Sequence, residues 1–214
     1  MKKSINILNL LKFVSIYSIL ITGCSSGPAY THTPSEYSLP VKYCAQKQQY
    51  WCWAACSEMV MKYLDTNNVH VIYEQCALAH STLDVTQRNL PCCVSGNLDN
   101  ACNHTNWPVF EECGFSCINT DETRDYFSWE DMCQQIDSSK PICLTWNWNC
   151  GGAHMIVMDG YKIVEDELFV HLLDPYAGFD SLYMYSSSRY ITQSENRYGN
   201  DHILGRCYYG ITKN

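Results

Sequence analysis

The chain has 214 residues, and 46% of them are hydrophobic, which suits one domain with a buried core and excludes a disordered chain. Its formal net charge is -8, from 22 acidic residues against 14 lysines and arginines. A chain with this acidic balance and no block of like charges is not expected to attract nucleic acid.

The first 23 residues have the pattern of an export signal. Lys2 and Lys3 form a charged start, and the uncharged run after Lys12 has the length of a signal-peptide core, which is too short to span a bilayer. The signal ends in "ITGC", which resembles a bacterial lipobox and predicts a lipid on Cys24 as the new N-terminus. We therefore expect an exported lipoprotein, anchored to a bacterial membrane on its periplasmic or outer side. An ordinary secretory signal with a chance cysteine is the alternative.

Residues 24–40 contain ten Ser, Gly, Pro or Thr residues and predict a flexible tether between the lipid and the folded part. From residue 41 to residue 214 the composition is that of one globular domain, and no internal repeat is visible. Loss of residues 1–23 removes three lysines, so the net charge of the mature chain goes from -8 to -11.

Helical patterns fill the first half of this domain, and strand patterns fill the second. Cys52–Leu64 is rich in good helix formers, and Ser128 with Asp131 three residues later is a helix-start pattern for a segment that runs to about residue 136. Shorter helical candidates are residues 73–80 and 106–113. The strand candidates are residues 141–146, 154–161, 168–173, 182–185 and 203–209. Helices followed by antiparallel strands predict an α+β fold.

Cysteine is unusually frequent for a chain of this length. Fourteen cysteines in an exported chain indicate an oxidising compartment and a disulfide-rich domain. Without a lipidated Cys24 thirteen remain, and an odd number leaves at least one thiol free or paired with another chain. If that thiol is Cys52, twelve cysteines are left for six disulfides, whose connectivity cannot be deduced from the sequence.

A structural zinc ion is the alternative use of these cysteines. The cysteines between residues 92 and 117 lie close together in the sequence, with His104 among them. A repeated C-x-x-C pair is missing, however, and an oxidising compartment favours disulfides over zinc sites. We therefore expect neither a metal nor a cofactor.

The segment "AQKQQYWCWAAC", residues 45–56, places Cys52 where a glutamine-rich loop meets the predicted helix. A helix N-terminus favours the thiolate, and a neighbouring histidine can take the proton, so the sulfur can become a nucleophile. The alternative is that Cys52 is half of a disulfide. Cys56 lies one turn further along the same helical face and is interpreted as a core or disulfide cysteine.

Of the seven histidines, His154 is the best candidate for the base, because it follows small residues and begins an apolar strand pattern. The next strand pattern ends at Asp174, just before a proline. A hairpin folded about residue 164 places positions 154 and 174 opposite each other, so Asp174 can orient the imidazole. His171 is the rival base, but it lies mid-strand between apolar residues, where a packed histidine is the commoner explanation.

A third group is needed to stabilise the oxyanion of an acyl-transfer reaction. Gln46 lies six residues before Cys52, and its side-chain amide and the Cys52 N–H can converge on one oxygen. Gln48 and Gln49 are the rivals for this role.

The motifs "QKQQYWCWAAC", "GGAHMIVMDGY" and "HLLDP" together resemble a papain-like cysteine protease, most closely the branch of secreted bacterial effector proteases. The resemblance covers about residues 41–210. It implies a central helix that opens with the nucleophile Cys52, packed on a sheet half that carries His154 and Asp174. It also implies that the oxyanion donor is the glutamine six positions before the nucleophile, which is Gln46.

Three features depart from papain itself. Trp51 stands before the nucleophile where papain has a small residue, the 102 residues that separate Cys52 from His154 are fewer, and six disulfides exceed what the fold needs. These departures leave the substrate preference open more than the mechanism. Trp146 and Trp148 are expected in the core, where one of them can shield the bond between the histidine and its partner, as a tryptophan does in papain.

The resemblance predicts a monomeric thiol hydrolase that cleaves peptide bonds in a protein or peptide substrate. Acyl transfer by the same triad, as in transpeptidases and transglutaminases, requires only a different acceptor and stays open. The third hypothesis is a disulfide-bonded binding domain on the cell surface that has no catalytic activity. The presence of Gln46, Cys52, His154 and Asp174 together argues against it.

Overall fold

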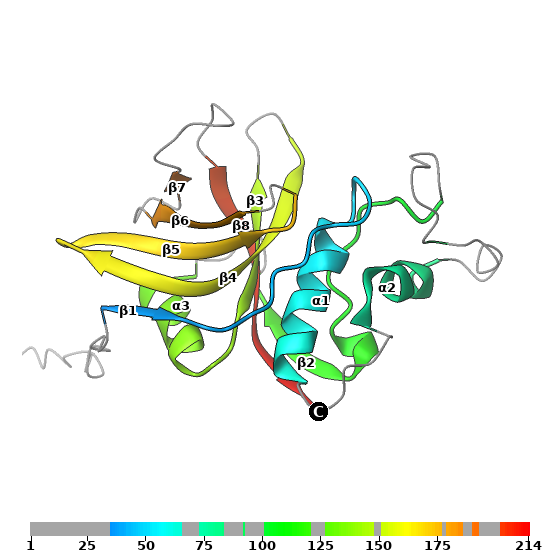
Figure 1. Cartoon of the computed structure of the whole chain (residues 1–214), viewed down its shortest axis with the longest axis horizontal. Helices are drawn as coiled ribbons and strands as arrows, with labels where there is room; N and C mark the ends of the chain where they lie inside the picture. Colours follow the sequence, from blue (N-terminus) through cyan, green and yellow to red (C-terminus); the bar gives the residue numbers. More distant parts are fainter. Residues whose placement is uncertain are drawn as a thin grey trace, which may run out of the picture. The chain divides into compact units, whose positions relative to one another are not determined.

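The computed structural model describes residues 35–65, 73–83, 92, 101–120, 127–147, 151–176, 179–185, 190–192 and 202–214. It has the α+β arrangement that the sequence predicts, with a helical part beside a largely antiparallel sheet (Figure 1). The helices are α1 (Cys52–Leu64), α2 (Gln75–Ser81) and α3 (Trp129–Asp137), with a short 3₁₀ turn, η3 (Glu111–Cys113). Among these described helices none is long and apolar enough to cross a membrane.

α1 is the central element of the core. Its residues 53–61 are all buried, and the helix packs against α2 on one side and against β3, β4 and β8 of the sheet on the other. A helix that is buried on nearly all its faces belongs to the interior of a domain. α1 therefore joins the helical part of the fold to the sheet, and its first residue is Cys52.

The sheet is antiparallel throughout its described pairings. Its strands are β1 (Glu36–Ser38), β2 (Phe115–Asn119), β3 (Ile142–Asn147), β4 (Ala153–Val164), β5 (Glu167–Asp174), β6 (Phe179–Tyr185), β7 (Tyr190–Thr192) and β8 (His202–Lys213). The strand order is β1-β4-β3-β8-β7-β6-β5, β2 pairs with β8, and β4 also pairs with β5. Because β4 has both β3 and β5 as neighbours, the strands from β3 to β8 close on themselves.

The main elements predicted from the sequence are confirmed. The helix over Cys52–Leu64 has the expected bounds, and α3 begins with a capping box in which the Ser128 hydroxyl accepts the Asp131 N–H. The helix expected over residues 106–113 is wrong except for η3. Pro108 interrupts that segment, since proline lacks an N–H and disfavours a helical conformation in the residue before it.

The N-terminal boundary of the folded unit also differs from the expectation. Glu36–Ser38 pair with β4 as β1, and Leu39 is buried in the core. The tether expected over residues 24–40 is therefore too long at its C-terminal end, because strand pairing and an apolar contact hold residues 36–39 on the domain. The expected signal peptide and Cys24, the expected site of lipidation, lie outside the described residues.

Gly160 provides a test of how tightly β1 is held. A Cβ atom at this position would lie 2.8 Å from the Tyr37 carbonyl oxygen and 3.0 Å from Ser38. We expect Gly160→Ala to lower the free energy of unfolding by about 1–3 kcal/mol, because backbone atoms of β1 must move away. Urea unfolding followed by circular dichroism measures this change. An unchanged midpoint and slope would show that β1 does not pack on β4 in solution.

Candidate active site

Cys52 is held at the start of α1 by the two tryptophans that flank it. Trp51 and Trp53 are almost completely buried, and their indole N–H groups donate to the carbonyl oxygens of Cys102 (2.6 Å) and His104 (3.1 Å). The helix has no side-chain cap at its N-terminus. The thiol therefore lies at a positive, uncapped helix end whose position is fixed by anchors on both sides.

His154 lies near the start of β4, opposite Trp146 of β3. Two residues with positive φ, Gly151 at 92° and Gly152 at 93°, lead the chain into this strand. A residue with a Cβ atom is strained in that conformation, so the two glycines allow the sharp approach that brings His154 toward α1.

Asp174 is the last residue of β5, and its carboxylate oxygen Oδ1 lies 2.6 Å from Nε2 of His154. The same oxygen accepts the N–H of Tyr176 at 2.9 Å, which holds the carboxylate in place. The side chains of His154 and Asp174 are only 13% and 3% exposed. The ion pair is thus largely shielded from water. Electrostatic interactions are stronger in such a buried setting than in water.

The hairpin that brings these two residues together differs slightly from the expected one. Its turn is at Glu165–Asp166, which have positive φ angles, and not at residue 164. An irregularity between Met158 and Gly160 then shifts the register of β4 against β5. The shifted register still leaves the two side chains within hydrogen-bonding distance at the same end of the hairpin.

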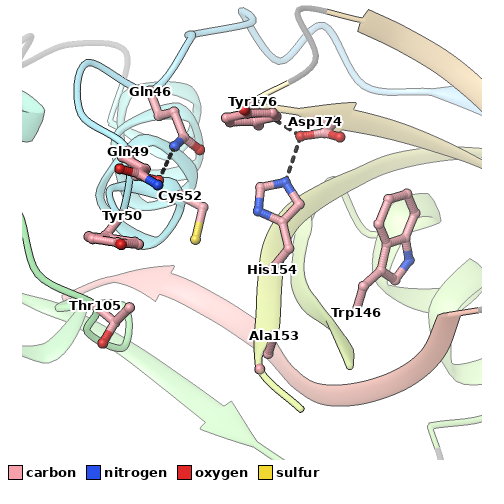
Figure 2. Close-up of a pocket in the computed structure, with 11 residues that line it drawn as sticks. Gln46, Gln49, Tyr50, Cys52, Thr105, Trp146, Ala153, His154, Asp174 and Tyr176 are labelled. Atoms are coloured by element: carbon pink, nitrogen blue, oxygen red, sulfur yellow. Dashed lines mark hydrogen bonds and ion pairs between the residues drawn. The ribbon is translucent and has the colours of Figure 1, made fainter. Parts of the chain in front are cut away.

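Figure 2 shows the imidazole of His154 between Asp174 and Cys52, with Nδ1 turned toward the sulfur. A hydrogen bond joins the Cys52 thiol to His154, and the sulfur also accepts the backbone N–H groups of Met155 and Trp53. Three side chains from a helix and two strands therefore form one hydrogen-bonded series, in the order Cys52, His154, Asp174.

The pKa values of Cys52 and His154 shift in opposite directions. Burial by itself would raise the pKa of Cys52, but the hydrogen bond and the charge of His154, with the two backbone N–H groups, lower it. Burial would lower the pKa of His154, but its bonds to Asp174 and Cys52 raise it to about 9. Both shifts favour a thiolate beside an imidazolium at neutral pH.

Gln46 lies beside this series, on the loop that precedes α1 (Figure 2). Its backbone N–H donates to the carbonyl oxygen of Pro175, next to Asp174, at 2.9 Å. Its side-chain Nε2 donates to the backbone carbonyl oxygens of Gln48 (2.9 Å) and Gln49 (2.7 Å), while Oε1 is buried without a hydrogen-bond partner. The loop thus brings Gln46 to the site with its amide hydrogens turned toward neighbouring carbonyl groups.

A cavity of about 540 Å³ opens over the Cys52 sulfur. Its lining includes Gln49, which the sequence offered as a rival to Gln46, and several residues that the sequence did not single out: Tyr50, Thr105, Ala153 and Tyr176. Tyr176 also meets the His154 ring edge-on, with the ring centroids 6.4 Å apart. Residues 50 and 105 are far apart in the sequence and carry no catalytic pattern, so only the folded chain places them together.

The sequence matches the model of the Peptidase_C39 like family over residues 38–203, which is most of the chain. The chain belongs to this family. Comparison with curated proteins gave no match. One similar solved structure is described as "Structural basis for the limited antibody cross reactivity between the mite allergens Blo t 1 and Der p 1", with a TM-score of 0.46 and 12% identity, covering 85% of this chain and 72% of that chain.

In this member of the family His171 has a carboxylate partner of its own. Its Nδ1 pairs with Oδ1 of the buried Asp159 on β4, and neither residue lines the cavity over Cys52. Trp146 is buried, lies opposite His154 across β3 and β4 and lines the cavity, and its shielding role stays a prediction. Trp148 lies outside the described residues.

The cysteines are less cross-linked than the sequence predicts. Cys92 and Cys102 form a disulfide, which removes both from the zinc hypothesis, and Cys76 is also disulfide-bonded. The other cysteines of the described ranges are free thiols: Cys44, Cys52, Cys56, Cys113, Cys117, Cys133, Cys143 and Cys207. These eight free thiols rule out the arrangement in which Cys52 alone is unpaired and six disulfides take the other twelve cysteines. Several of these thiols are buried on separate core elements, where cysteine packs as a small apolar side chain.

Cys44 is the matched control for the reactivity of Cys52, since both thiols are free and half-buried. Burial and the charge of Glu58 raise the pKa of Cys44 to about 11, whereas the pKa of Cys52 is lowered. We expect iodoacetamide at pH 7 to label Cys52 at least about tenfold faster than Cys44, because the thiolate is the nucleophile. Peptide mapping by mass spectrometry measures both rates. Preferential labelling of Cys44 would contradict the assignment.

Proposed function

We propose that the chain is a cysteine peptidase that cleaves peptide bonds by the papain-like mechanism. The observation that supports this most is the series Cys52–His154–Asp174, with a lowered thiol pKa and a raised imidazole pKa, at a helix N-terminus that opens into a cavity. A thiol activated by a histidine that a carboxylate orients is the arrangement that nucleophilic acyl transfer needs.

The proposed reaction begins with attack of the Cys52 thiolate on the carbonyl carbon of the substrate. The C–S bond forms and the carbonyl oxygen becomes negatively charged. His154 then gives its proton to the leaving amine as the C–N bond breaks, which leaves a thioester on Cys52. Water attacks the thioester while His154 takes one of its protons, and the acid product leaves as the C–S bond breaks, which restores the thiolate–imidazolium pair.

Gln46 is proposed to supply one hydrogen bond to the oxyanion, together with the Cys52 N–H. In the free enzyme both amide hydrogens of Gln46 are turned to the neutral carbonyl groups of Gln48 and Gln49. A charged oxygen is a stronger acceptor than a neutral carbonyl, so the developing oxyanion can recruit one of these hydrogens. Gln48 and Gln49 would then act through their backbones and not as donors.

The surroundings of the reaction are part of the same proposal. Export and a lipid on Cys24 would place the enzyme on a bacterial membrane surface, acting as a monomer on peptide or protein substrates and not on nucleic acid. The W-C-W-x-A context around Cys52 supports a place in the branch of secreted effector proteases. Neither the proposed reaction nor its residues require a metal or a cofactor.

Four alanine variants show how much each of the four proposed residues contributes to kcat/KM. Cys52→Ala and His154→Ala should remove nearly all kcat/KM on a fluorogenic peptide, because both groups take part in bond making and breaking. Gln46→Ala should cost about 100- to 1000-fold through the loss of one oxyanion donor. Asp174→Ala should leave the most activity, since Asp174 only orients and stabilises the imidazole.

His171→Ala is the matched control for this series, because it removes a histidine that is also paired with a buried aspartate. It should retain activity in a protein with a native circular dichroism spectrum. Activity lost in His171→Ala and kept in His154→Ala would reverse the assignment of the base. Addition of amines to the assay would reveal transpeptidation products if the physiological reaction is acyl transfer.

The pH dependence follows from the pKa of His154, which is about 9 in the folded chain. Below that value His154 carries the proton that the leaving amine needs, and above it this proton is lost. Peptide cleavage should therefore fall as the pH rises through about 9, whereas alkylation of Cys52 should not fall, because the thiolate persists. Parallel pH profiles of kcat/KM and of iodoacetamide alkylation test this difference. Cleavage that stays constant to pH 10 would contradict it.

A further inference from the structure

The loop that carries Gln46 is held on both sides by the side chain of Gln75. Gln75 is the first residue of α2 and is fully buried. Its Oε1 accepts the N–H of Lys47 at 2.8 Å, and its Nε2 donates to the carbonyl oxygen of Ala45 at 3.0 Å. One amide group therefore binds the two peptide groups that flank Gln46.

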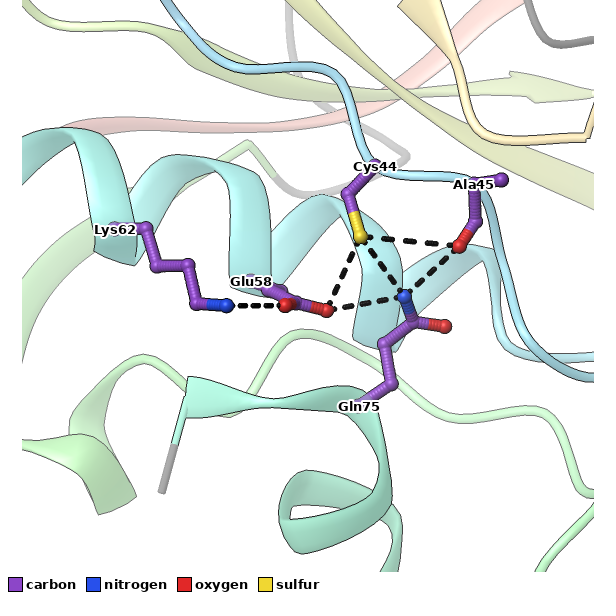
Figure 3. Close-up of polar contacts among 5 residues, drawn as sticks. All are labelled: Cys44, Ala45, Glu58, Lys62 and Gln75. Carbon is purple, nitrogen blue, oxygen red and sulfur yellow. Dashed lines mark hydrogen bonds and ion pairs between the residues drawn. The ribbon is translucent and has the colours of Figure 1, made fainter. Parts of the chain in front are cut away.

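The orientation of this amide is set by Glu58, near the middle of α1 (Figure 3). Nε2 of Gln75 also donates to Oε2 of Glu58 at 3.0 Å. A carboxylate only accepts hydrogen bonds, so the NH₂ group must face Glu58, and Oε1 is left for Lys47. The amide thus has one possible orientation, which matches the donor and the acceptor that the loop presents.

Glu58 is itself fixed and charged, although only 4% of it is exposed. Burial would raise its pKa, but hydrogen bonds from Lys62, Gln75 and the Cys44 thiol lower it. Lys62 contacts the other carboxylate oxygen at 2.6 Å, one helical turn further on. A buried carboxylate with several donors is a rigid support, because removal of any partner leaves a buried charge less well satisfied.

The backbone of Gln46 is therefore fixed relative to two parts of the site. Gln75 and Glu58 attach its flanking peptide groups to α1, the helix that begins with Cys52. The bond from the Gln46 N–H to Pro175 attaches it to the segment that follows Asp174. The side chain of Gln46 has three rotatable bonds beyond this backbone, so a small rotation of the loop displaces its amide by about 1 Å, enough to reduce catalysis severely.

We propose that Gln75 is a positioning residue, which holds the loop over residues 45–47 so that the Gln46 amide reaches the oxyanion of the reaction. Gln75 does not line the cavity over Cys52, and it acts only through the loop. This inference rests on the proposed function, in particular on an oxyanion site next to Cys52.

Two reactions of Cys52 separate positioning from general structural damage. Acylation by p-nitrophenyl acetate forms a thioester on Cys52 and releases p-nitrophenolate, and it passes through an oxyanion. Alkylation by iodoacetamide forms a thioether and releases iodide, without an oxyanion. Both reactions start from the same Cys52 thiolate, and neither leaving group needs a proton from His154. The ratio of the two single-turnover rates at pH 7 therefore reports on the oxyanion site alone.

We expect Gln75→Met to lower this ratio at least about tenfold, while alkylation stays within about twofold of wild type. Gln46→Ala should lower the ratio about 100- to 1000-fold. The double variant should be no slower than Gln46→Ala alone, because Gln75 acts only through Gln46 and the two losses are then not additive. Gln75→Asn keeps the uncharged amide but shortens the side chain by one methylene group, so it can meet only part of its hydrogen-bond partners and should give an intermediate ratio.

Tyr73→Phe is the matched control. Tyr73 lies two residues before Gln75, and the substitution removes a buried hydrogen bond from its hydroxyl to Asp65. This bond does not involve the loop over residues 45–47, so the ratio should stay unchanged. An unchanged ratio in a folded Gln75→Met variant, or equal losses in both reactions, would overturn the inference. If Gln75→Met does not fold, the Gln75→Asn ratio decides in the same way. Absence of acylation in the wild-type protein would overturn the proposed function together with this inference.

Discussion

The candidate site depends most on the contact between Cys52 and His154, because this hydrogen bond links the first residue of α1 to β4 of the sheet. A thiol is a poor nucleophile at neutral pH unless a positive group stabilises its anion. The helix end, two backbone N–H groups and an imidazolium provide that stabilisation here, and Asp174 stabilises the imidazolium in turn. Each group depends on the others, so the site requires α1, β4 and β5 in one fixed arrangement.

Buried polar contacts supply much of that arrangement. The tryptophans beside Cys52 donate to the segment at residues 102–104, and the loop before α1 is attached to Glu58 through Gln75. A buried polar group without a partner is costly, so each of these contacts selects one position for the backbone it holds. The apolar core keeps the domain folded, while these hydrogen bonds hold the segments that carry the reactive groups in place.

Much of the fold and of the candidate site could be predicted from the sequence, because the patterns involved act over a few neighbouring residues. The helix at Cys52–Leu64 follows from its helix-forming residues, and the long strands follow from runs of apolar and β-branched residues. The pairing of His154 with Asp174 could be anticipated because a hairpin tolerates a shifted turn and still brings its ends together. Short strands such as β1 and β2 could not be anticipated, because their stability comes from the strand beside them and not from their own residues.

The sequence by itself determined the chemistry available to the chain: a thiol at a helix start, a histidine and an aspartate at the ends of one hairpin, and an acidic surface charge. Only the tertiary structure decided which thiols pair and which pack in the core, why His171 faces Asp159, and how Gln75 meets the loop of Gln46. The reason is physical. Helix and strand preferences act over a few neighbouring residues, whereas a hydrogen bond between residues 47 and 75 exists only once the intervening chain has folded.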